Sequence, residues 1–125
     1  MEYWITMATI LLIDDDEQVR RLCQIALEAK GHRVLTADSG RQGLQVSDQQ
    51  DVDLALVDMF MMDMDGLEVI KLLHLTRPNC KIIVMSGGSS NEDVFKTAMQ
   101  VGAHAMLKKP FELQELLDAV ADQLM

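Results

Sequence analysis

Hydrophobic residues follow two alternating patterns along the chain. Short runs of consecutive apolar residues are typical of strands that are buried on both faces. Apolar positions that recur every three or four residues are typical of helices with one face on the core. The first pattern predicts strands over residues 9–13, 34–36, 53–57, 81–85 and 105–107. The second pattern predicts helices over residues 17–30, 40–49, 66–76, 90–101 and 112–124.

Polar residues near the helix ends support these boundaries. Asp65 and Glu68 have capping-box spacing at the start of the third helix, and Ser90 and Asp93 have it at the start of the fourth. The turn around Pro78 ends the third helix. The apolar faces predicted for the first and last helices consist of Val19, Leu22, Cys23, Ala26 and Leu27, and of Leu113, Leu116, Leu117 and Val120.

The alternation of strands with helices predicts an α/β fold with a parallel sheet and right-handed crossovers. We expect a doubly wound, three-layer sandwich around a five-stranded parallel sheet, with the flavodoxin-like strand order 2-1-3-4-5. No linker or internal repeat interrupts the pattern, so residues 9–125 are expected to form one domain. Residues 1–8 lie outside the pattern and are interpreted as an N-terminal extension.

The composition narrows the range of functions. The net charge of −9 makes direct binding of nucleic acid unfavourable and attracts divalent cations. No apolar stretch is long enough to span a bilayer and the start does not resemble a signal peptide, so we expect a cytoplasmic protein without membrane contact. Cys23 and Cys80 have no metal-site spacing and are interpreted as reduced thiols.

Polar residues follow four of the predicted strands. In an open parallel sheet, ligands bind beyond the carboxyl ends of the strands, so we expect these side chains to share one pocket. They are Asp14, Asp15 and Asp16 after the first strand, Asp58 after the third, Ser86 after the fourth and Lys109 after the fifth.

The charges in that pocket indicate a bound cation. Two carboxylates about 4 Å apart repel by roughly 4 kcal/mol at an effective dielectric constant near 20. One lysine does not balance three acids, whereas Mg²⁺ binds one or two carboxylates together with water and phosphate oxygens. The pocket is therefore predicted to hold Mg²⁺ and a transferred phosphoryl group.

Four segments carry a resemblance to a known family. LLIDDDEQVR, LALVDMFMMDMDG, IIVMSGG and LKKPF stand at the ends of four predicted strands. In their order and spacing, from Thr9 to near the end of the chain, the sequence resembles the receiver domain of two-component response regulators. Each segment alone is a weak signal, and the four together are a specific one.

The resemblance implies a metal site and a phosphoacceptor. Asp58 would accept a phosphoryl group from a phosphohistidine of a sensor kinase or a histidine phosphotransfer protein. Asp15 would bind Mg²⁺ directly, Asp14 would hold it largely through water, and the backbone carbonyl of Phe60 would be a further ligand.

The resemblance also implies how the phosphoryl group is held. Ser86 would donate a hydrogen bond to it, and Lys109 would pair first with Asp58 and then with the phosphoryl group. The peptide bond before Pro110 is expected to be cis, which would aim Lys109 into the pocket. Neither Phe60 nor Gly88 can orient a water molecule, so slow self-dephosphorylation is expected, with no further enzymatic activity.

The resemblance implies partners besides the kinase. An output domain or a downstream protein would receive the signal, and a homodimer stays open.

The sequence leaves two alternative functions. The stretch IDDDEQ resembles the start of haloacid-dehalogenase-type phosphatases, with Asp14 as nucleophile and Asp16 as acid, although Gln18 stands where that family has Thr or Val. An unphosphorylated protein-interaction domain of the same fold is the second alternative. Asp16 is also interpreted as an acid at a helix N-terminus, Lys108 as a solvated lysine, and the three histidines as structural or exposed.

Overall fold

The computed structural model describes residues 7–87 and 92–125. The strands are β1 (Thr9–Ile13), β2 (Arg33–Ala37), β3 (Leu54–Asp58), β4 (Lys81–Ser86) and β5 (Ala105–Lys108). The helices are α1 (Glu17–Ala29), α2 (Gly40–Gln49), α3 (Gly66–Thr76), α4 (Glu92–Val101) and α5 (Leu113–Leu124). All strand pairs are parallel and the order is β2-β1-β3-β4-β5, which confirms the predicted fold and strand order.

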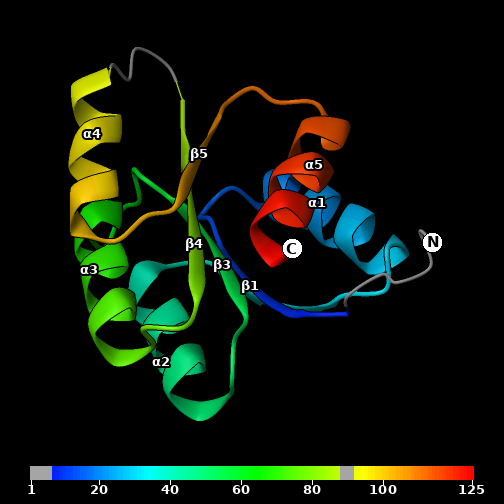
Figure 1. The fold of residues 1–125 in the computed structure, drawn as a ribbon, viewed down its shortest axis with the longest axis horizontal. Coiled ribbons are helices and arrows are strands. Elements are labelled where there is room, and N and C mark those ends of the chain that lie inside the picture. The colour runs from blue at the N-terminus through cyan, green and yellow to red at the C-terminus, as the bar shows by residue number, and fades with distance from the viewer. Residues whose placement is uncertain (1–6, 88–91) are drawn as a thin grey trace.

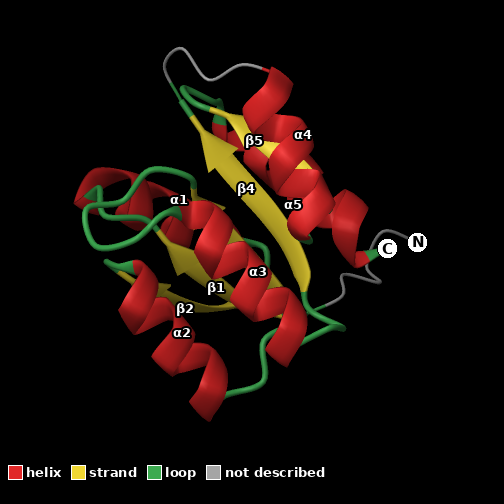
Figure 2. Cartoon of the chain, turned by 90° about the vertical axis from the view of Figure 1, so that its left-hand side faces the viewer, coloured by secondary structure: helices red, strands yellow, loops and turns green. Residues whose placement is uncertain are grey.

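The sheet is the middle layer of a three-layer sandwich. Figure 1 shows α1 and α5 on one face of the sheet and α2, α3 and α4 on the other. In Figure 2 the strands point the same way, and loops gather beyond their arrowheads. No helix in the described part of the chain combines the length and the hydropathy needed to cross a bilayer.

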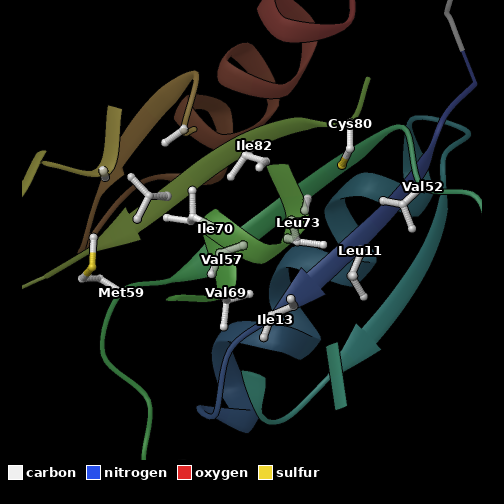
Figure 3. Packing of buried hydrophobic residues seen from close by; sticks show 14 of the residues in the cluster. Leu11, Ile13, Val52, Val57, Met59, Val69, Ile70, Leu73, Cys80 and Ile82 are labelled. Carbon is white, nitrogen blue, oxygen red and sulfur yellow. The ribbon is translucent and has the colours of Figure 1, made fainter. Parts of the chain in front are cut away.

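Side chains of β1 alternate between two hydrophobic clusters because successive residues of a strand point to opposite faces. Ile10 and Leu12 belong to the cluster beneath α1 and α5. Leu11 and Ile13 belong to the cluster beneath α2, α3 and α4, which Figure 3 shows with Val57 of β3 and Leu73 of α3. Burial of both faces explains why the strands read as continuous apolar runs.

Two strands extend one residue beyond their apolar runs and end on a polar residue. Asp58 is the last residue of β3 and pairs with Met85, and Ser86 is the last residue of β4 and pairs with Lys108. Both were predicted to follow their strands. Backbone pairing with neighbouring strands therefore fixes the positions of both residues.

Two predicted core positions were wrong. Leu22 of α1 is 55% exposed and Leu113 of α5 is 43% exposed, although both fall on the predicted apolar faces. Their helical spacing is regular, but both side chains line a pocket instead of packing into the core. The predicted N-cap Ser90 lies outside the described residues.

Candidate functional site

The carboxyl ends of the strands bring three acids together. Asp14 follows β1 directly, Asp15 comes next, and Asp58 ends the neighbouring strand β3. One carboxylate oxygen of each lies within 4.8 Å of those of the other two. Asp14 and Asp58 are buried, whereas Asp15 is exposed. The adjacency of β1 and β3 in the middle of the sheet produces this cluster.

Lys109 extends into the cluster from the end of β5. Its Nζ donates to Asp14 Oδ2 at 2.7 Å and lies 3.5 Å from Asp58 Oδ1. Burial lowers the pKa of Lys109, but the hydrogen bonds and charges of Asp14 and Asp58 outweigh it, so the pKa is raised above the ordinary value. The peptide bond between Lys109 and Pro110 is cis, as predicted.

Asp14 has a partner for each of its polar groups. Its backbone N–H donates to the Ala37 carbonyl at 3.2 Å, and its own carbonyl accepts from Arg20 Nη1 at 2.7 Å. One carboxylate oxygen accepts from the Asp16 N–H at 2.9 Å and the other from Lys109. These contacts allow a fully buried carboxylate to stay in place.

Asp58 stands in a less favourable environment. It is 6% exposed, and its pKa is raised to about 6. Burial is the largest cause and the charge of Asp14 is the next, while Lys109 and the Phe60 backbone N–H act in the opposite direction. The ionised form therefore lacks full compensation from its protein neighbours.

Ser86, at the same edge of the sheet, also lacks favourable contacts for its polar group. It is 1% exposed, and its Oγ has no hydrogen-bond partner among the described residues. An unsatisfied buried hydroxyl costs about 1–3 kcal/mol. A ligand oxygen at this edge would satisfy it.

The loop after Asp58 packs closely against the end of β3. A Cβ at Gly66 would lie 2.5 Å from the Asp58 carbonyl oxygen, so this position admits glycine alone without a shift. Within the loop, the Met62 N–H donates to Asp15 Oδ2 at 3.3 Å. The side chain of Phe60 is 62% exposed. The loop thus passes directly beside the acids.

The donor set suits a hard divalent cation. Three carboxylates supply oxygen ligands, which Mg²⁺ prefers. The raised pKa of Asp58 means that a nearby positive charge would be favourable, and the exposed Asp15 leaves room for a hydrated ion. These residues fit such an ion.

Other polar residues have structural contacts. Asp16 caps α1 by accepting from the Gln18 and Val19 N–H groups, and Asp65 caps α3, as predicted for both. Asp63 lies in the loop between β3 and α3, and its carboxylate accepts from the N–H groups of Gly40 and Arg41 at the start of α2. No local sequence signal marks that contact.

A largely apolar pocket of about 480 Å³ adjoins the acidic cluster. It lies between α1 and the segment that joins β5 to α5, and Lys109 forms part of its wall. Its lining residues are Val19, Leu22, Cys23, Gly87, Lys109, Pro110, Phe111 and Leu113. Leu22 and Leu113, which were wrongly assigned to the core, thus line a pocket beside the acidic cluster.

Comparisons with known proteins agree with this geometry. Residues 10–121 match the family described as response regulator receiver domain. The chain is 33% identical over 117 residues to the transcriptional regulatory protein GlrR of Escherichia coli K12, covering 94% of this chain and 26% of the relative. It is 32% identical over 108 residues to the cell cycle transcriptional regulator CtrA of Caulobacter vibrioides, covering 86% of this chain and 46% of that protein.

Solved structures show the same fold. The crystal structure of a CheY-like receiver domain protein from Methanospirillum hungatei JF-1 superposes with a TM-score of 0.90 at 30% identity, covering 95% of this chain and 94% of the other. The chain spans between about a quarter and a half of the length of the curated relatives named here.

Proposed function

Because this chain belongs to the response regulator receiver domain family, whose members are signalling domains phosphorylated on an aspartate, we propose that Asp58 is its phosphoacceptor. The donor is a phosphohistidine of a sensor kinase or of a phosphotransfer protein. The observation that carries the proposal is the placement of Asp58 at the end of β3, between Asp14 and Lys109, with a pKa raised to about 6.

Asp58 has the protonation state that the chemistry needs. With a pKa of about 6, its carboxylate is largely ionised at neutral pH and can act as the nucleophile. A carboxylate oxygen forms a bond to phosphorus while the bond from phosphorus to the imidazole nitrogen breaks, and the imidazole keeps that electron pair. Receiver chemistry is then mainly positioning and charge neutralisation.

Ser86 and Lys109 provide contacts for the transferred group. The Ser86 hydroxyl, which lacks a partner among the described residues, would donate to a phosphoryl oxygen. Lys109 Nζ, 3.5 Å from Asp58 Oδ1, would follow the negative charge from the carboxylate to the phosphoryl group. Both interactions would favour the phosphorylated form.

Mg²⁺ belongs to the same proposal. Asp14, Asp15, Asp58 and the backbone carbonyl of Phe60 would hold the ion. When bound, it supplies positive charge that offsets the charge on the phosphoryl oxygens. Self-dephosphorylation is expected to be slow, because the exposed Phe60 side chain has no polar group to orient water. Gly88, which entered the same prediction, lies outside the described residues.

The apolar pocket beside Lys109 supports a protein partner at this edge. A phosphohistidine donor must approach Asp58 closely, and Val19, Leu22 and Leu113 offer apolar contact area beside that route. We further propose residues 9–125 as the receiver domain, residues 1–8 as an extension, and a cytoplasmic location. An output domain or a downstream protein would receive the signal.

The phosphatase alternative is not favoured. It requires Asp16 as an acid, but the Asp16 carboxylate accepts two backbone hydrogen bonds as the cap of α1.

Phosphorylation by acetyl phosphate tests the proposal. With Mg²⁺ present, the protein is expected to gain one acid-stable, base-labile phosphoryl group, seen by intact mass. Asp58→Asn and addition of EDTA should each abolish the gain, while Asp122→Asn, a matched change at an exposed aspartate of α5, should keep it. Undiminished phosphorylation of the Asp58→Asn variant would refute Asp58 as the acceptor.

A further inference from the structure

Arg20 makes a contact that the proposed phosphotransfer chemistry does not use. Its Nη1 donates to the backbone carbonyl of Asp14 at 2.7 Å, and the contact is partly buried. Side chains on a helix lean toward its N-terminus, so Arg20 of α1 can reach back over the first turn to the end of β1. The neighbouring Arg21 is exposed.

The carbonyl of Asp14 belongs to the peptide unit that joins the two proposed metal ligands. Rotation of that peptide would turn the Asp14 and Asp15 carboxylates relative to each other. Asp14 is held by Lys109 and by the Asp16 N–H. Asp15 is exposed, and within the described ranges its carboxylate accepts a single hydrogen bond, from the Met62 N–H at 3.3 Å. Its direction therefore depends strongly on the backbone that carries it.

We propose that Arg20 is a positioning residue for the acidic site. Its guanidinium fixes the peptide between Asp14 and Asp15, and so holds both carboxylates in the arrangement that binds the divalent cation. The inference rests on the proposed function, because it assumes that these acids bind Mg²⁺. Partners that orient metal ligands in this way typically contribute 10- to 100-fold to metal affinity.

The charge of Arg20 makes the inference sharply testable. A positive side chain near three acids repels an incoming cation, so removal of its charge alone would strengthen Mg²⁺ binding. Loss of its hydrogen bond to the Asp14 carbonyl would weaken Mg²⁺ binding. The two effects have opposite signs, and the observed direction decides between them.

The experiment compares matched variants by calorimetric titration with Mg²⁺. Arg20→Met is expected to weaken Mg²⁺ binding, raising the dissociation constant roughly tenfold. Arg21→Met removes the same charge from the same helix without touching Asp14, so it should leave affinity within about twofold, on the tighter side. Arg20→Lys keeps the charge and one donor on a shorter stem, and should recover part of the loss.

A second measurement does not require the metal. In EDTA, Arg20→Met should shift the amide resonances of Asp15 and Asp16, whereas Arg21→Met should leave them in place. If Arg20→Met does not fold, as judged by circular dichroism, the milder Arg20→Lys variant carries the test and should still bind Mg²⁺ more weakly than the wild type.

Unchanged or tighter Mg²⁺ binding by a folded Arg20 variant would overturn the positioning role. Failure of the proposed function would look different. In that case the wild type itself would bind no Mg²⁺, and neither arginine variant would matter.

Discussion

The two ends of the sheet differ in how well their polar groups are paired. At the amino ends of the strands, side chains accept the N–H groups that strand pairing leaves over. His32 accepts from Ala8 at 3.2 Å, Asp53 from Thr9 at 2.8 Å, and His104 from Ile82 at 3.0 Å. This end is well satisfied, and its polar side chains stabilise the fold.

At the carboxyl ends, two polar residues are left with less than full compensation. Asp58 has a pKa raised to about 6, and Ser86 Oγ has no partner within the described ranges. Polar side chains therefore stabilise the fold at the amino ends, whereas Asp58 and Ser86 at the carboxyl ends could still gain interactions from a ligand. Functional sites are commonly stabilised less than the scaffold that carries them.

Removal of Lys109 should have the largest effect on stability. It is the cation that lies between the buried carboxylates of Asp14 and Asp58. Breaking a buried ion pair from one side costs about 3–5 kcal/mol, because the other charge stays buried. We expect Lys109→Met to lower the free energy of unfolding by about 3 kcal/mol in urea titrations in EDTA.

The matched control is Lys108→Met, one residue earlier and exposed, which should change stability by less than about 0.5 kcal/mol. Equal effects of the two variants would mean that the carboxyl end is not held together by this cation.

Neutralising Asp58 should have the next largest effect, and in the opposite direction. Between its ordinary pKa of 3.8 and its folded pKa of about 6, the folded protein keeps a proton that the unfolded chain has lost. Stability therefore falls as the pH rises through this window, and the deficit is fully present at neutral pH. Asp58→Asn should stabilise the protein at pH 7.5 in EDTA by roughly 2–3 kcal/mol.

Thermal melts from pH 3.5 to 7.5 measure this effect. The advantage of Asp58→Asn over the wild type should shrink toward zero below about pH 4. An advantage that did not depend on pH would show that the burial of a charged Asp58 carboxylate, together with its repulsion by Asp14, is not the cause.

The smallest effect is expected at the amino end. His104→Ala removes the acceptor of the Ile82 N–H, which should cost about 1 kcal/mol at pH 7.5. His74→Ala, an exposed histidine whose charge lowers the pKa of His104, is the matched control and should cost less than about 0.5 kcal/mol.

The pH dependence at His104 should run opposite to that at Asp58. Burial, Lys81 and His74 lower the pKa of His104 below its ordinary 6.5. As the pH falls below 6.5, the unfolded chain binds a proton that the folded chain resists, so this stabilisation is lost in acid. The cost of His104→Ala should therefore shrink on acidification, and a growing cost would contradict the hydrogen bond.

The sequence alone determined the fold and the edge of the sheet at which the proposed site lies. Apolar runs buried on both faces produce a strong pattern, and parallel strands place all their carboxyl ends at one edge. The sequence therefore allowed one site to be predicted from Asp14, Asp15, Asp58, Ser86 and Lys109. The neutral form of His32 and His104, the cap that Asp63 provides and the exposure of Leu22 were not visible in this way.

Tertiary structure decided the contacts whose partners are set by side-chain reach. Arg20 meets the Asp14 carbonyl and Asp63 meets Gly40 because loops and helix ends converge in space. Whether the Ser86 hydroxyl has a partner also depends on which segments lie near it, and within the described ranges it has none. The hydrophobic pattern of a helix or strand predicts which of its side chains face the core, because burial repeats with the period of that element. It does not record which polar atom lies within about 3 Å, because that depends on how distant segments pack.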